Sequence, residues 1–147
     1  MKIVKGYIYS NSFCGSEIPQ NVQNLFIRDF CEKNNLKYLL SSVEFSISES
    51  TYSLYGALDE LHNIHGLVFY SLYQLPYNNI ERKKIYKKLF EKKNKIFYFA
   101  LENLKLEKKK DIENIEILWQ LKKIILKQNV DYTNIKKYGN RKILYSK

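Results

Sequence analysis

Residues 3–34 read IVKGYIYSNSFCGSEIPQNVQNLFIRDFCEKN, a strand pattern that passes through a loop into a helix pattern. The first part is a short apolar run bounded by polar residues, as expected of a buried strand. Turn-forming residues follow, and Pro19 suits a first helical turn. Beyond it, apolar side chains recur at the spacing of one helix face as far as Cys31. The stretch therefore predicts a strand at residues 3–10 and an amphipathic helix at residues 19–34.

The same alternation of strand and helix patterns continues along the chain. Strand patterns occur at residues 37–45, 67–70 and 95–101, and helix patterns between them occupy residues 52–65 and 80–91. Connections of about a dozen residues or more join parallel strands, and the helices then pack on the faces of the sheet. The sequence thus predicts the α/β fold class, with three layers around a mostly parallel sheet of four or five strands.

The C-terminal part of the chain follows a different pattern. Residues 107–128 carry apolar side chains at helical spacing, including Trp119, whereas residues 129–147 are polar, basic and rich in tyrosine. We expect residues 1–105 to form the α/β domain. Residues 106–128 should form a long helix packed on that domain or on a second subunit. Residues 129–147 should form a weakly ordered basic tail.

Length and composition exclude several classes of protein. The chain has 147 residues, of which 45% are hydrophobic, and this suits one folded domain. Two cysteines cannot build a disulfide framework, and no apolar run approaches the roughly 18 residues of a membrane span. The first residues enter the first strand without the apolar region of an export signal. We therefore expect a cytoplasmic protein with no membrane span.

The net charge of +10 comes entirely from the second part of the chain. Residues 1–80 hold five Lys or Arg and seven Asp or Glu, whereas residues 81–147 hold twenty and eight. Only three of the basic residues are arginines, whose planar guanidinium is preferred for phosphate and base recognition. The excess is typical of a solvated lysine surface, and a basic partner-binding surface is the alternative. We do not expect nucleic acid as a partner.

Polar side chains follow each predicted strand at its carboxyl end, where open parallel α/β sheets bind ligands. Others lie at the start of the first helix, whose N-terminus can face an anion. The set comprises Ser10, Asn11, Ser12, Gln20, Gln23, Glu44, Ser71, Tyr73, Gln74 and Glu102. Because the strand ends meet at one edge of the sheet, we predict a ligand site there.

The set holds two carboxylates and several hydroxyl groups. Glu44 and Glu102 are candidates for general acid and base, one of them with a raised pKa; alternatively, each pairs with a lysine or arginine. Ser10 is a candidate nucleophile, but it needs a neighbouring base, and no histidine lies near the strand ends in sequence. Arg28 either clamps an acidic ligand group or pairs with a carboxylate of its own helix.

The sequence indicates neither a cofactor nor a metal. His62 and His65 have no third ligand nearby and suit a helix surface better than a metal site. Gly15 is the single glycine of the loop after the first strand, so this loop matches neither the dinucleotide fingerprint nor the P-loop. Cys14 in the same loop has no visible activator. We expect Cys31, on the apolar stripe of the first helix, to belong to the core.

Three stretches carry a resemblance to a known family. Residues 6–12 read GYIYSNS, Gln20 and Gln23 open the first helix, and residues 72–75 read LYQL after the third strand. In this arrangement residues 3–104 resemble the catalytic domain of serine resolvases and invertases. In that family the first strand carries an arginine and the nucleophilic serine, and an Asp-Arg pair follows the third strand.

The departures from the resolvase pattern concern the reacting groups. The position of the strand arginine is Tyr9, that of the nucleophile is Asn11, and the Asp-Arg pair is replaced by Tyr73 and Gln74. A resolvase needs those guanidinium groups to stabilise the transferring phosphoryl centre. The resemblance therefore implies the fold, and we do not expect a functional serine recombinase.

A second set of strings extends from residue 6 to about residue 120. It comprises GYIYS at 6–10, PQNVQN at 19–24, IRDFC at 27–31, YLLS at 38–41 with Glu44, YSLYQLP at 70–76 and ALE at 100–102. These strings resemble the small sporadic carbohydrate cluster proteins, which are encoded among bacterial surface-sugar biosynthesis genes. The resemblance implies an arginine where this chain has Asn11 and a histidine where it has Tyr98.

We therefore expect a protein of bacterial surface-carbohydrate biosynthesis that binds or modifies a sugar, sugar phosphate or nucleotide sugar at the strand ends. Catalysis would rest on Glu44, Glu102 and Ser10. The substrate-binding residues would be Tyr7, Asn11, Gln20, Gln23, Arg28, Ser71, Tyr73 and Gln74. The alternative is an inactive resolvase-like binding or scaffold protein that contacts a partner enzyme or nucleic acid. The long C-terminal helix favours a homodimer in either case.

Overall fold

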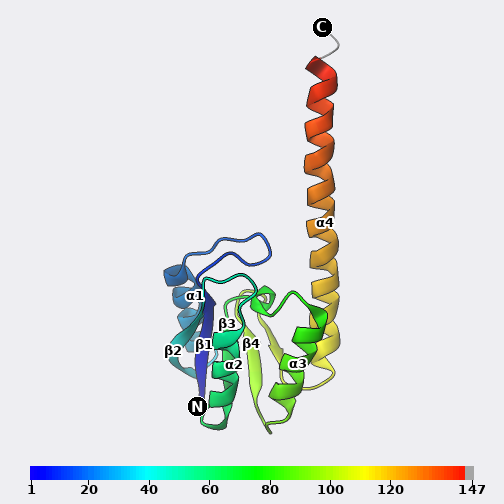
Figure 1. The fold of residues 1–147 in the computed structure, drawn as a ribbon. Helices are drawn as coiled ribbons and strands as arrows, with labels where there is room; N and C mark the ends of the chain where they lie inside the picture. Colours follow the sequence, from blue (N-terminus) through cyan, green and yellow to red (C-terminus); the bar gives the residue numbers. More distant parts are fainter. Residues whose placement is uncertain (145–147) are drawn as a thin grey trace. The chain divides into compact units, whose positions relative to one another are not determined.

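A five-stranded sheet organises the α/β part of the chain (Figure 1). The computed structural model describes the backbone of residues 1–144 and the side chains of residues 1–129. The strands are β1 (Lys2–Tyr9), β2 (Leu36–Glu44), β3 (Gly66–Phe69), β4 (Ile96–Phe99) and β5 (Leu104–Leu106), in the spatial order β2-β1-β3-β4-β5. The first four are parallel and β5 pairs antiparallel with β4. The predicted fold class is confirmed.

The helices lie where the apolar periodicity predicts them. They are α1 (Gln20–Lys33), α2 (Tyr52–Asp59), α3 (Asn79–Phe90) and α4 (Asp111–Leu144), with short 3₁₀ helices η1 (Glu60–His62) and η2 (Leu72–Gln74). The predicted second helix therefore ends early in a 3₁₀ turn, and η2 occupies part of a predicted loop. Gly66 does not cap the preceding helix but is the first residue of β3. Glycine suits this position because a Cβ there would lie 2.0 Å from the Ile96 carbonyl oxygen.

Helix α4 differs from the prediction at both ends. It begins at Asp111 and continues to Leu144, so most of the stretch expected to be a weakly ordered tail is helical. Residues 145–147 of that predicted tail lie outside the described residues. The chain divides into two compact units, Met1–Ile112 and Glu113–Lys147. None of the described helices is both long and apolar enough to span a membrane.

The direction of the crossovers places the helices of the first unit on two faces of the sheet. The chain moves one way from β1 to β2 and the opposite way from β2 to β3 and β4. Because such crossovers are right-handed, α1 covers one face and α2 and α3 cover the other, as Figure 1 shows. The strand order reverses between β1 and β3, and this reversal marks where ligands bind in open α/β sheets.

The core under α1 is apolar and aromatic. It includes Val4 and Ile8 of β1, Ile27 and Cys31 of α1, and Val68 of β3. Cys31 is 1% exposed, which places it in the core as predicted, and burial raises the pKa of its thiol to about 11. This packing fixes the start of α1 against the carboxyl end of β1.

Candidate functional site

Two buried glutamines join the carboxyl ends of β1 and β3 at the point where the strand order reverses. Gln23 donates through Nε2 to the carbonyl oxygens of Tyr9 (3.0 Å) and Ile18 (2.7 Å), and its Oε1 accepts from the Tyr9 N–H (3.0 Å). Gln74 donates through Nε2 to Gln23 Oε1 at 2.7 Å. Its own Oε1 accepts from the backbone N–H groups of Tyr70 and Ser71. The side-chain amides of both glutamines are therefore hydrogen-bonded within the protein.

Glu44 caps the N-terminus of α2 from the end of β2. The carboxylate is 3% exposed and accepts five hydrogen bonds. Two come from the backbone N–H groups of Ser53 and Leu54 in the first turn of α2, each at 3.1 Å. The others come from the Tyr7 hydroxyl at 2.7 Å, the Ser50 hydroxyl at 2.8 Å and the Phe45 N–H at 3.1 Å.

These hydrogen bonds decide the charge state of Glu44. Burial by itself raises the pKa of a carboxyl, but the donors around Glu44, the Tyr7 hydroxyl foremost, outweigh burial and leave its pKa below the ordinary value. A raised pKa, as a general acid would need, is therefore not found at Glu44. Its carboxylate is held ionised and enclosed, an arrangement that stabilises the turn into α2.

Glu102 performs a similar task for η2. Its Oε1 accepts from the Ser71 hydroxyl at 2.6 Å and its Oε2 accepts from the Leu72 N–H at 3.0 Å. Ser71 in turn accepts from the Tyr73 N–H at 3.2 Å. Neither Glu102 nor Glu44 forms an ion pair with a lysine or arginine among residues 1–129. Each carboxylate thus has its own set of donors and holds the end of a different element.

The remaining residues of the predicted site divide into bound and exposed ones. The Ser10 hydroxyl donates to the Glu44 carbonyl oxygen at 2.8 Å and contacts the Ser46 hydroxyl at 3.0 Å, and neither partner can act as a general base. Asn11 and Gln20 are exposed at the same edge. Tyr73 is half-buried against the core, and burial, with the nearby charges of Glu102 and Cys14, raises its pKa.

Arg28, which was expected among the substrate-binding residues at the strand ends, lies away from this group. It stands eight positions after Gln20, or about 12 Å along the helix axis. Its guanidinium carbon lies 5.7 Å from the centroid of the Tyr38 ring, and it lines a cavity with Leu36 at the start of β2. Within the described residues no carboxylate pairs with it.

Tyr7 and Tyr9 complete the polar end of β1. Tyr7 is fully buried, and burial together with Tyr9 and Glu44 raises the pKa of its phenol well above the ordinary value. Sequence reasoning selected Tyr7 but missed Tyr9, whose ring meets that of Tyr7 at 5.7 Å. It also missed Ser50 and Ser53; the signal that could have found them is the run of serines before a predicted helix start.

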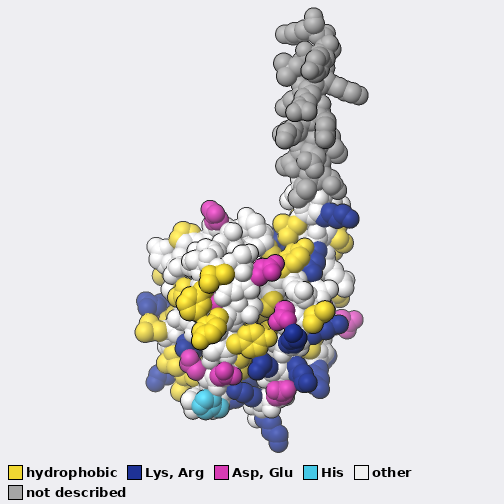
Figure 2. Space-filling view, viewed as in Figure 1, with side chains coloured by type: hydrophobic (Ala, Val, Ile, Leu, Met, Phe, Trp, Pro, Cys, Tyr) yellow, Lys and Arg dark blue, Asp and Glu magenta, His cyan; other side chains and the backbone are white. Residues whose placement is uncertain are grey.

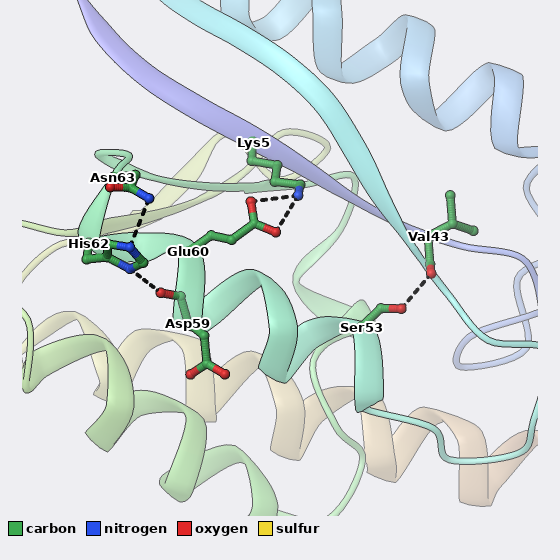
Figure 3. Close-up of polar contacts among 7 residues, drawn as sticks. All are labelled: Lys5, Val43, Ser53, Asp59, Glu60, His62 and Asn63. Carbon is green, nitrogen blue, oxygen red and sulfur yellow. Dashed lines mark hydrogen bonds and ion pairs between the residues drawn. The ribbon is translucent and has the colours of Figure 1, made fainter.

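The histidines lie at the opposite end of the sheet and form no metal site. His65 accepts the Ile3 N–H at Nδ1 (3.0 Å). Figure 3 shows His62 between the Asp59 carbonyl oxygen and Asn63, beside the pair in which Lys5 Nζ lies 2.8 Å from Glu60. No group of three or more potential metal ligands occurs in the described part of the chain.

Known proteins resemble this chain in fold and not in sequence. No family model and no curated protein shows a significant match to it. The N-terminal catalytic domain of TP901-1 integrase is similar with a TM-score of 0.64 and 12% identity, over 87% of this chain and 99% of that one. A resolvase family site-specific recombinase from Streptococcus pneumoniae is similar with a TM-score of 0.59 and 9% identity, over 92% and 98%. The protein has a resolvase-like fold.

Proposed function

We propose that this protein is a catalytically inactive, self-associating binding protein built on the resolvase-like fold. The observation that carries the proposal is the internal use of the strand-end side chains. Gln23 and Gln74 bond each other and backbone groups, while Glu44 accepts five hydrogen bonds. Groups that are fully hydrogen-bonded in the resting protein have to break those bonds before they serve a substrate.

The chemistry of the edge supports the same proposal. Strand exchange needs guanidinium groups at the transferring phosphoryl centre. Arg28 lies elsewhere, and Arg82 is buried, with its guanidinium donating to the carbonyl oxygens of Pro76 and Tyr77. A trapping assay for a covalent protein–DNA adduct tests this part. We expect none with supercoiled or mixed-sequence DNA, and an adduct would overturn the proposal.

An exposed apolar stripe on α4 supports the self-association part of the proposal. Ile117, Leu121, Ile124 and Ile125 are each between 46% and 53% exposed. The first three follow one another at intervals of four and three residues, the spacing of a coiled-coil seam. A second copy carries the same stripe, so a two-fold dimer can cover it on both chains.

Sedimentation equilibrium of the full chain tests the dimer. We expect a concentration-dependent dimer that Leu121→Glu converts to a monomer, because a charge in an apolar seam is buried without a partner. Asn21→Glu is the matched control, since it adds the same single negative charge at an exposed position of α1, outside the stripe. A monomer at every concentration, or equal effects of the two variants, would contradict self-association through this stripe.

The lysine surface does not add a nucleic-acid partner to the proposal. Figure 2 shows Lys and Arg side chains gathered over α3. Several lysines there have partners: Lys84 pairs with Glu81 at 2.7 Å, Lys88 lies 5.4 Å from the centroid of the Tyr55 ring, and Lys92 donates to the Leu58 carbonyl oxygen at 2.9 Å. These contacts favour a solvated lysine surface.

Binding of a carbohydrate at the strand-end edge is the second candidate function. It rests on the exposure of Asn11, Ser12 and Gln20 above the bonded residues. The strings that resemble surface-sugar biosynthesis proteins have no support from a family model or a curated protein. Calorimetry against nucleotide sugars, sugar phosphates and sugar acids tests carbohydrate binding. We expect Asn11→Ala and Gln20→Ala to weaken any ligand found, with exposed Asn63→Ala at the other end of the sheet as the control. No heat of binding with these compounds would remove this candidate.

A further inference from the structure

A groove opens on the α1 face of the sheet. Its volume is about 550 Å³, within the usual range for small-molecule sites. It is lined by the end of α1 and the start of β1 and β2 on one side and by β4 and β5 on the other. A smaller cavity of about 310 Å³, which contains Arg28, shares Asn35 and Leu36 with it.

Tyr98 of β4 presents its hydroxyl to this groove. The residue is 9% exposed, and its hydroxyl is open to solvent and forms no hydrogen bond with the described residues. A solvent-facing phenol hydroxyl can donate to a ligand. Burial raises the pKa of Tyr98, so the phenol stays protonated and remains a donor at neutral pH. The ring of Phe30 lies 6.0 Å from the Tyr98 ring, and the two form an aromatic wall.

The charged groups around the groove are mostly cationic. Lys2 and Lys105 line it, and Lys105 is the cross-strand neighbour of Tyr98, so the two side chains emerge on the same face. Glu107, outside the lining, accepts an ion pair from Lys105 at 2.7 Å. The side-chain amide of Asn103 adds a neutral donor. No carboxylate lines the groove, so the local charge favours an anion.

We propose that this groove binds a small phosphorylated ring compound, with the ring against Phe30 and Tyr98 and the phosphate held by the Tyr98 hydroxyl, Lys2 and Asn103. A phosphate has three acceptor oxygens and can satisfy all three groups at once. An apolar wall with a few convergent polar groups is the usual composition of a small-molecule site. The groove shares no lining residue with the strand-end set, and the proposal is independent of the function proposed above.

Phenyl phosphate titrated into the ¹⁵N-labelled full chain tests the proposal by NMR. We expect saturable shifts at the side-chain amides of Asn34, Asn35 and Asn103, which line the groove. Inorganic phosphate and benzoate should each bind at least about threefold more weakly. Inorganic phosphate lacks the ring, and the carboxylate of benzoate has two acceptor oxygens where the phosphate has three. Absence of saturable shifts at these amides, or equal affinity for phenyl phosphate and inorganic phosphate, would overturn the proposal.

Tyr98→Phe is the decisive variant because it removes the hydroxyl and keeps the ring. Loss of one hydrogen bond should weaken phenyl phosphate binding roughly three- to tenfold. Tyr70→Phe is the matched control: Tyr70 is 8% exposed in the same core cluster but does not line the groove. Lys2→Gln, at an exposed position, should weaken binding and reduce its dependence on salt. Equal affinities of the Tyr98→Phe and Tyr70→Phe proteins would overturn the assignment.

Discussion

The side-chain amide of Gln74 donates to the side-chain oxygen of Gln23 at 2.7 Å, and neither residue has any exposed surface. The two are 51 positions apart, and this bond joins η2 to α1 at the reversal of strand order. Around it, the backbone of Tyr9, Ile18, Tyr70 and Ser71 is held by the same two side chains. A buried polar network in which every member is satisfied rigidifies its surroundings.

Breaking this network should destabilise the protein strongly. Gln74→Leu leaves the Tyr70 N–H, the Ser71 N–H and a Gln23 lone pair without their partner. We expect a loss of about 3 kcal/mol or more in the free energy of unfolding, measured by urea denaturation, because each of the three unsatisfied buried groups costs at least about 1 kcal/mol. Gln20→Leu is the control, since Gln20 belongs to the same helix as Gln23 but is exposed. A Gln74→Leu protein as stable as the Gln20→Leu protein would contradict the structural role.

Glu44 should make the protein sensitive to acid. Burial raises its pKa, but the hydrogen bonds of Tyr7, Ser53 and Ser50 outweigh burial, so the folded-state pKa lies below that of the unfolded chain. A lowered folded pKa contributes stability above the unfolded value, and this stability is lost as the pH falls through the folded value. We expect Glu44→Gln to be about 1–3 kcal/mol less stable at pH 7 and to lose less stability on acidification.

Urea denaturation from neutral to acidic pH measures both effects. The control is Glu49→Gln, which removes an exposed carboxylate from the neighbouring loop. Parallel pH profiles for wild type and Glu44→Gln would show that this carboxylate is not the acid-sensitive group. Catalysis is not needed for either readout, so the prediction holds whatever the protein binds.

The sequence was informative about this edge because topology alone brings strand ends together. Gln23 and Gln74 were both predicted at the edge, and they do meet there. The role of the two glutamines could not be predicted, because a polar side chain at a strand end can either contact a ligand or hydrogen-bond the protein's own backbone. Which of these applies depends on distances of a few tenths of an ångström, and the sequence pattern does not contain them.

Two residues show where sequence reasoning failed for physical reasons. Arg28 was listed with the strand-end residues, although it lies eight positions after Gln20, about 12 Å along the axis of α1. Tyr98 was noted only as the position where the family resemblance implies a histidine, since an aromatic residue in a strand by itself predicts core packing. Only the structure reveals that its hydroxyl faces a groove on the α1 face of the sheet.

Tyr9 should contribute to unfolding at high pH. Burial raises the pKa of Tyr9 to about 12, whereas tyrosines of an unfolded chain ionise near their ordinary pKa of 10.0. A raised folded pKa contributes stability that is fully present below pH 10 and is lost as the pH rises towards the folded value. We expect Tyr9→Phe to lose less stability between those values, as followed by circular dichroism. Tyr52→Phe, at a position 77% exposed, is the control and should titrate as wild type.

Gly66 and Gly56 have opposite surroundings, so replacing each with alanine tests the close packing of two strands and, separately, the open surface of a helix. Gly66→Ala would place a Cβ 2.0 Å from the Ile96 carbonyl oxygen, inside the pairing of β3 with β4. Backbone atoms there cannot move without breaking the ladder, so we expect a loss of about 3 kcal/mol or more in the free energy of unfolding. Gly56→Ala meets no atom within 4 Å and lies within α2, so it should gain about 0.5–1 kcal/mol from the higher helix propensity of alanine. Urea denaturation of the two variants measures both changes, and a Gly66→Ala protein as stable as wild type would contradict the register of β3 against β4.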